Sequence, residues 1–191
     1  MTSADERAEV VFETMRTRRA VRAFTDEPVS DADIRRIIEA ARWASSAGNR
    51  RLHRFYVTRD PRKVELISTI GPGFYGTPAA VIVICTDLEK AERLGVRRER
   101  DVSTWIDVGT AAMNMQLMAH ALGLGSTPVT SVSRSGLRAA LDILDHLRAD
   151  LLLQLGHPAS EPGRRGLGQR LPIDAITDWE TFGGEMPADV A

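Results

Sequence analysis

The sequence has very little cysteine: Cys85 is the only one among 191 residues. A single thiol cannot form a disulfide within the chain, so a reducing cytosol is its natural compartment. Cys85 also lies inside the apolar run AVIVIC, where burial keeps a thiol protonated and unreactive. The sequence therefore excludes a disulfide-stabilised scaffold and gives no support to a cysteine nucleophile.

Excess charge of either sign is also absent. The chain has 25 basic and 26 acidic residues and a formal net charge of -1, whereas proteins that bind nucleic acid or anionic membranes rely on a positive surplus. No apolar stretch approaches the ~20 residues of a membrane-spanning helix, and the first residues lack the basic start and apolar run of a secretion signal. We therefore expect a soluble, cytoplasmic protein that binds neither nucleic acid nor membrane.

Motifs for metal-dependent or nucleophilic chemistry are likewise missing. The four histidines show no metal-ligand spacing, and no GxSxG motif occurs. The glycines of GPGFYG, residues 71–76, match the dinucleotide-binding pattern, but here a helical pattern precedes and a strand pattern follows, which is the reverse of what that motif needs and favours a turn. Asp107 and His120 could act as acid or base, although such residues on a buried helix are more often hydrogen-bonded core groups. The sequence predicts no metal site and no catalytic side chain.

What the chain does contain is enough apolar material for one domain over residues 1–191. Hydrophobic residues make up 43% of the sequence, and a chain of this length supports a single core. Capping-box patterns, Ser3 with Glu6 and Ser30 with Asp33, begin predicted helices that end near residues 17 and 43. Periodicity predicts further helices at residues 61–70, 103–122 and 134–143, strands at 54–59, 79–87 and 150–155, and a strand or extended loop near 127–132. The run at 79–87 is continuously apolar, which is typical of a central strand covered on both faces.

The predicted helix at residues 103–122 is apolar on nearly every side and ends at Gly123. Only a narrow stripe of Asp107, Thr110 and Asn114 is polar. A helix that is apolar all round must be enclosed on all sides, and in a short chain a second subunit is the simplest cover.

The stretch RTRRAVRAF, residues 16–24, places four arginines within seven positions. Guanidinium groups present a planar fork of donors, so such a cluster suits a phosphate or carboxylate. The alternative is that arginines at the end of a helix complement the negative end of its dipole and bind no ligand. The cluster alone leaves both possibilities open.

Six segments, taken in chain order, carry a resemblance to a known family. They are the arginine cluster, PVSDADIRRIIEAARWASSAGN, GFYGTPAAVIVI, DVGTAAMNMQLMAHALGLGS with the TPVTS that follows, LGHPA, and Arg170 before Leu-Pro. Together they resemble the nitroreductase family of FMN-dependent NAD(P)H oxidoreductases. The resemblance implies an α+β fold with a central mixed β-sheet flanked by helices. It also implies an intertwined homodimer with a long buried dimer-core helix and an FMN in each of two interface pockets.

The resemblance further implies which residues hold FMN. Arg18 would contact the phosphate, with Arg19 lining the same site and Arg170 closing on it. Arg22 would reach the N1/O2 edge of the flavin, where a fixed cation favours the reduced ring. A main-chain N–H of Thr130 or Ser131 would point toward N5. The full implied set also contains the segment that covers the ring and the loop contributed by the partner subunit, namely Pro128 and Val129, and Ser45, Ser46 and Asn49.

Three departures from the family pattern alter this picture. Ala20 stands where the family usually has a serine, so one hydroxyl donor to the phosphate is lost. Gly168 stands where some members have a lysine, which places more weight on Arg18 and Arg170 unless Arg164 or Arg165 substitutes for it. The usual Asn-x-Gln-Pro-Trp is replaced by a more basic sequence that changes the pocket wall, running from Asn49 through Arg50, Arg51 and Leu52 to His53.

The activity implied is hydride transfer from NADH or NADPH, through the flavin, to a small-molecule acceptor such as a nitroaromatic or quinone, in a ping-pong sequence. Two alternatives stay open. The same pocket could oxidise a specialised metabolite or peptide. The chain could also bind flavin without turnover. The altered loop at residues 44–55 and the smaller number of donors at the phosphate site would favour this alternative.

Overall fold

A four-stranded antiparallel sheet lies at the centre of the fold. The structure is a computed structural model that describes residues 3–96, 102–160 and 170–184. The strand order is β1-β2-β4-β3, and every neighbouring pair is antiparallel. The bounds are β1 (His53–Thr58), β2 (Ala80–Asp87), β3 (Gly125–Val129) and β4 (Leu147–Gly156). The parallel part of the predicted mixed sheet is a single bridge between Ala20 and Ser126.

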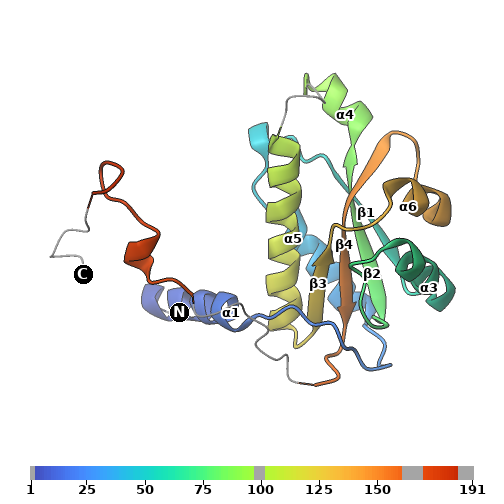
Figure 1. Cartoon of the computed structure of the whole chain (residues 1–191), viewed down its shortest axis with the longest axis horizontal. Helices are drawn as coiled ribbons and strands as arrows, with labels where there is room; N and C mark the ends of the chain where they lie inside the picture. Colours follow the sequence, from blue (N-terminus) through green and yellow to red (C-terminus); the bar gives the residue numbers. More distant parts are fainter. Residues whose placement is uncertain (1–2, 97–101, 161–169, 185–191) are drawn as a thin grey trace.

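Helices cover both faces of this sheet (Figure 1). Ile82 and Ile84 of β2 pack with α2 (Asp31–Arg42) and α5 (Ser103–Ala121) in one core cluster. Val81 and Val83 pack with α3 (Pro61–Ile70) and α6 (Arg134–Leu141) in the other. Alternate residues of a strand point to opposite faces, so a strand covered on both sides is apolar throughout. The prediction of a central strand at residues 79–87 is confirmed.

Burial also accounts for the unreactive thiol that the sequence predicts. Cys85 is 2% exposed on β2, and burial raises the pKa of its thiol to about 12. At neutral pH the group is therefore protonated and packs as a small apolar side chain.

Element boundaries differ from the predictions by more than one residue in three elements. β3 starts and ends earlier than residues 127–132, because the chain turns after Val129 and the Val132 N–H bonds to the Thr130 carbonyl. β4 is longer than predicted and starts at Leu147. The helix predicted to reach residue 143 ends at Leu141, because Asp142 adopts the left-handed conformation with φ 51°.

The first helix, α1 (Ala4–Thr17), buries none of its residues. Its apolar side chains are exposed, Val10 by 65% and Phe12 by 58%, and so is Ile106 of α5, by 61%. Figure 1 shows α1 extending away from the sheet beside one end of α5. The described chain therefore covers α5 on its inner side and leaves an apolar outer surface.

Three short elements complete the described chain: η1 (Ala47–Asn49), α4 (Leu88–Arg93) and η2 (Ile173–Ala175). The charged segment of residues 88–101 begins with α4, and residues 97–101 lie outside the described part of the chain. Within the described ranges, no helix has the length and apolar content needed to cross a bilayer.

The arginine cluster leaves α1 as an extended segment attached to the sheet. The Val21 N–H donates to the Ser126 carbonyl at 3.1 Å, and the Thr127 hydroxyl donates to the Val21 carbonyl. Beyond it, Phe24 forms an antiparallel bridge with Pro158. Backbone bonds therefore fix residues 20–24 beside β3 and the end of β4.

This attachment depends on Gly125. A Cβ at position 125 would lie 2.7 Å from Cβ and both γ carbons of Val21, which is too close for any side chain. Val21 is buried and β-branched, so it has little freedom to move away.

We expect Gly125→Ala to lower the free energy of unfolding by about 1–3 kcal/mol, the range for overpacking a buried site. Urea denaturation measures it. Adding Val21→Ala removes two of the three atoms in conflict, so the double variant should lose less than the sum of the two single losses. Additive losses would show that the two residues do not touch as described.

Candidate functional site

Three guanidinium groups gather where α1 ends. Arg18 is the C-cap residue of α1 and is partly buried, and its Nη1 lies 3.5 Å from Oε1 of Gln116 on α5. Burial lowers the pKa of Arg18, and the nearby charges of Arg19 and Arg170 lower it further. No carboxylate forms an ion pair with Arg18 within the described residues. The structure therefore brings Arg18, Arg19 and Arg170 together with unbalanced positive charge.

The second half of α5 forms the wall behind this cluster. His120 Nε2 lies 2.8 Å from the Thr17 hydroxyl, and its pKa is lowered by burial and by Arg18 and Arg19. At the other end of the helix, the Asp107 carboxylate accepts the Ala47 N–H at 2.9 Å. Both side chains are hydrogen-bonded as expected, Asp107 in a buried position and His120 in a partly buried one.

Arg22 lies farther along the same extended segment, on the exposed side. Its guanidinium stands over the ring of Tyr75, with 5.8 Å from Cζ to the ring centroid. Tyr75 belongs to the GPGFYG turn, which follows α3 and precedes β2, as the sequence predicts. Arg22 and this turn thus form one side of a shared surface.

The segment from Pro128 to Ser131 closes the surface from the end of β3. Val129 is buried, whereas Pro128, Thr130 and Ser131 are exposed. The Gly73 N–H points to the Ser131 carbonyl at 3.5 Å, and a Cβ on Gly73 would lie 2.1 Å from the Ser131 hydroxyl. The GPGFYG turn therefore touches both Arg22 and Ser131 and joins two predicted site segments.

Ala20 contributes its backbone to this arrangement. Its bridge with Ser126 fixes the chain between Arg19 and Arg22. The position carries no hydroxyl, so nearby donors to an anion come from the arginines.

The loop with Ser45, Ser46 and Asn49 does not join these residues within one subunit. The Ser45 carbonyl accepts the Thr110 hydroxyl at 3.1 Å, near the start of α5, whereas Arg18 lies at Gln116. From Asp107, which holds the Ala47 N–H, to Gln116 is nine helical residues, or about 14 Å at 1.5 Å per residue. The predicted residues thus form two separate groups.

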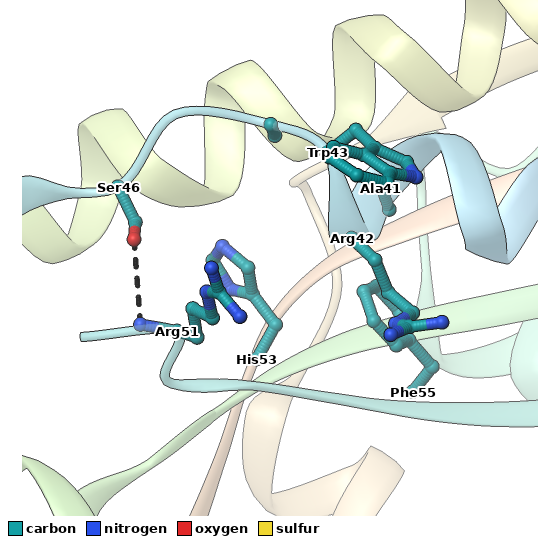
Figure 2. A pocket seen from close by; sticks show the side chains of 8 residues that line it. Ala41, Arg42, Trp43, Ser46, Arg51, His53 and Phe55 are labelled. Carbon is teal, nitrogen blue, oxygen red and sulfur yellow. Dashed lines mark hydrogen bonds between the residues drawn. The ribbon is translucent and has the colours of Figure 1, made fainter. Parts of the chain in front are cut away.

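A cavity of about 200 Å³ lies beside this loop, between the end of α2 and the start of β1 (Figure 2). Its walls are mostly aromatic and cationic, and they are made by Ala41, Arg42, Trp43, Ala44, Ser46, Arg51, His53 and Phe55. Trp43 is 81% exposed. Two of the residues that depart from the family pattern, Arg51 and His53, form part of this wall.

Arg51 and His53 are held differently. Arg51 has a φ of 51°, and its N–H and Nε donate to Ser46 Oγ and Asn49 Oδ1 at 3.3 and 2.9 Å. Both ring nitrogens of His53 are buried and have no hydrogen-bond partner in the described residues. Burial lowers the pKa of His53, and the negative charges of Asp107 and Asp150 oppose that effect only in part. The imidazole at this wall is therefore neutral at pH 7.

Two contributors to the site were not predicted from the sequence. Gln116 faces Arg18 from α5, and Gln154 of β4 bonds to the backbone of Tyr75. Gln154 is fully buried in an apolar strand, and a glutamine in such a run is the signal that could have indicated a buried polar contact.

Comparison with known proteins gives the same family as the resemblance in the sequence. The nitroreductase family model matches residues 15–70 and 68–157. The chain is 34% identical over 167 residues to a proposed NADH dehydrogenase/NAD(P)H nitroreductase of Methanothermobacter thermautotrophicus, covering 82% of each protein. It is 25% identical over 187 residues to an FMN reductase (NADPH) of Bacillus subtilis, covering 90% of this chain and 74% of that one.

Solved structures share the fold. A proposed nitroreductase of Desulfovibrio desulfuricans, crystallised in complex with FMN, superposes with a TM-score of 0.73 at 30% identity. The match covers 87% of this chain and 94% of that one. A nitroreductase family protein of Streptococcus pneumoniae superposes with a TM-score of 0.75 at 25% identity, covering 87% and 98%.

The neutral His53 predicts a pH dependence of stability. Its pKa is lowered by folding, so the unfolded chain binds the proton more readily, and stability falls as the pH drops below the ordinary value of 6.5. We expect the wild-type protein to unfold at a lower urea concentration at pH 5.5 than at pH 7.5. The same change of pH should lower the urea midpoint of His53→Phe by less. His120, whose pKa is lowered too, accounts for part of the loss that remains. Equal losses in both proteins would contradict the burial described for this ring.

Proposed function

The chain belongs to the nitroreductase family, and we propose that it is an oxidoreductase that holds FMN and takes electrons from NADH or NADPH. Relatives named NAD(P)H nitroreductase and FMN reductase support this proposal, and so does the solved relative that contains FMN. The observation that carries it is the group of Arg18, Arg19 and Arg170, whose positive charges meet without a carboxylate in the described chain.

A flavin phosphate fits this group in charge and in donor chemistry. Guanidinium forks form paired, charge-assisted hydrogen bonds with phosphate oxygens. Burial is the main cause of the lowered pKa of Arg18, and repulsion by Arg19 and Arg170 adds to it; a bound anion would offset that repulsion. The hydroxyl missing at Ala20 leaves the arginines as the main donors in our proposal.

The ring end of the proposed site is formed by Arg22 and the segment after β3. Arg22 places a permanent cation where negative charge would develop at N1, and such a fixed charge stabilises the reduced form. We assign the donor toward N5 to the N–H of Thr130 or Ser131, both exposed beside the Gly73 contact. Pro128 and Val129 would orient this segment.

Bound FMN would supply two-electron chemistry, taking a hydride from NAD(P)H and passing the electrons to a second substrate that uses the site in turn. The residues of the chain then bind, orient and exclude water, and none needs to transfer a proton. For the acceptor we propose a planar compound such as a nitroaromatic or quinone. The aromatic cavity wall beside Ser46 supports that class.

A homodimer completes the proposed site. The loop with Ser45, Ser46 and Asn49 contacts α5 at Thr110 and Asp107, about 9 and 14 Å along the helix from Gln116. In our proposal this loop reaches the flavin held by the partner subunit. The exposed apolar residues of α1 and α5, including Phe12 and Ile106, supply the contact surface. Apolar side chains exposed together in this way are typical of a subunit interface.

The decisive experiment is an anaerobic titration of the purified protein with NADH and with NADPH. We expect a yellow protein with bound FMN whose visible absorbance bleaches on adding one of the two donors, and a nitroaromatic or quinone should then restore the colour. A protein that stays yellow with both donors would support the non-catalytic flavin-binding alternative. A colourless protein that takes up no added FMN would contradict both.

Arg18→Ala should weaken FMN binding by about tenfold or more, because a hydrogen bond to a charged group contributes about 1.5–3 kcal/mol. Arg16→Ala is the matched control, because Arg16 is exposed and pairs with Glu13 at 2.7 Å on α1. Quenching of FMN fluorescence on binding gives the dissociation constants. Equal constants for the two variants would show that the phosphate lies elsewhere.

A further inference from the structure

The GPGFYG turn, residues 71–76, lies beside the proposed flavin site, and the function proposed above gives its Tyr75 no role. The turn contacts the Arg22 side chain through Tyr75 and lies close to the Arg22 backbone at Gly76. We propose that Tyr75 is a positioning residue that holds the Arg22 guanidinium in place and thereby raises the reduction potential of bound FMN. This inference rests on the proposed function, because it requires Arg22 at the N1/O2 edge of the flavin.

The first contact joins the two side chains. The Arg22 Cζ atom lies 5.8 Å from the centroid of the Tyr75 ring, within the range of cation–π attraction. Within the described residues, the Arg22 guanidinium makes no hydrogen bond and no ion pair, so its five donors are free for a ligand. Tyr75 is 51% exposed and Arg22 is exposed as well, so the guanidinium stays accessible. The ring therefore restrains the cation without neutralising it.

The second contact fixes the backbone on which the ring stands. Gln154 Nε2 donates to the Tyr75 carbonyl at 2.7 Å, and Gln154 Oε1 accepts the Tyr75 N–H at 3.4 Å. Gln154 is fully buried near the end of β4. The Gln154 side chain on β4 thus holds the Tyr75 backbone through both its amide nitrogen and its amide oxygen.

The third contact sets the distance between the turn and the Arg22 backbone. Gly76 has a φ of 66°, and a Cβ there would lie 2.5 Å from the Arg22 carbonyl oxygen. Only glycine allows so close an approach at a positive φ. The turn and the Arg22 backbone are therefore closely packed. The freedom left to Arg22 is rotation about its side-chain bonds, which contact with the Tyr75 ring restrains.

A restrained cation differs from a mobile one in its effect on a nearby redox group. Charge that is already oriented stabilises developing negative charge without a reorganisation cost, whereas an exposed arginine that samples many rotamers does so weakly. The reduced flavin gains from this, because the extra negative charge appears at N1 on reduction. Loss of the ring should therefore weaken binding of the reduced flavin more than of the oxidised one.

The test is the midpoint potential of bound FMN, measured by slow anaerobic reduction against a reference dye, together with the dissociation constant of oxidised FMN. Tyr75→Leu removes the π face and keeps the backbone bonds to Gln154, while Tyr75→Phe keeps the face and removes the hydroxyl. We expect Tyr75→Leu to lower the ratio of reduced to oxidised FMN affinity about three- to tenfold, or roughly 15–30 mV for a two-electron couple. Tyr75→Phe should keep the wild-type potential.

Arg22→Gln separates this role from a general structural one. It should lower the potential on its own, and adding Tyr75→Leu should then cause no further change, because the ring acts through the guanidinium. Equal shifts from Tyr75→Leu with and without Arg22, or a Tyr75→Phe potential matching that of Tyr75→Leu, would overturn the inference while FMN binding stands. If the wild-type protein binds no FMN, or Arg22→Gln leaves the potential unchanged, the proposed function or its placement of Arg22 fails, and this inference with it.

Discussion

The close approach of two backbones at Val21 and Gly125 constrains where the arginines can lie. Because position 125 carries no side chain, Val21 can bury itself against the start of β3 while its backbone bonds to Ser126. An extended segment alternates its side chains, so burying Val21 leaves Arg22 on the exposed side. The absence of a side chain at Gly125 thus allows the segment after α1 to attach to β3 with Val21 buried and Arg22 exposed.

The positive charges at this edge are arranged to stay unpaired. Arg16, two residues before Arg18 and within α1, forms an ion pair with Glu13. Arg18 and Arg19 instead lie near Arg170, and Arg22 faces an aromatic ring. Repulsion among like charges is unfavourable for folding unless an anion offsets it. The alternative that arginines complement the end of a helix applies to Arg16, which lies within α1, and to Arg19, whose Nη1 donates to the Arg16 and Arg18 carbonyls at 2.7 and 2.9 Å. It does not apply to Arg18, whose guanidinium faces Gln116, or to Arg22.

The sequence predicted most of the elements because each carries its own local signal. Capping boxes marked α1 and α2, and the unbroken apolar run marked β2. The end of α6 was missed, because a left-handed aspartate at position 142 has no distinctive pattern. The role of the GPGFYG turn was missed for a different reason: its contacts with Arg22, Ser131 and Gln154 join residues far apart in the chain, and local patterns do not report such contacts. The resemblance to the family indicated the site residues, but only the three-dimensional structure shows that they form two groups along α5.

That division has a thermodynamic consequence under the proposed function. A ligand that touches one group on each subunit binds the dimer and hardly binds the separated chains, so ligand binding and association are linked. Each molecule of bound flavin would then hold the two chains together, and dilution of the protein would release flavin. The helix α1, which buries nothing in a single chain, would be ordered by the same equilibrium. Cellular flavin supply would in this way set how much of the protein exists in its assembled form.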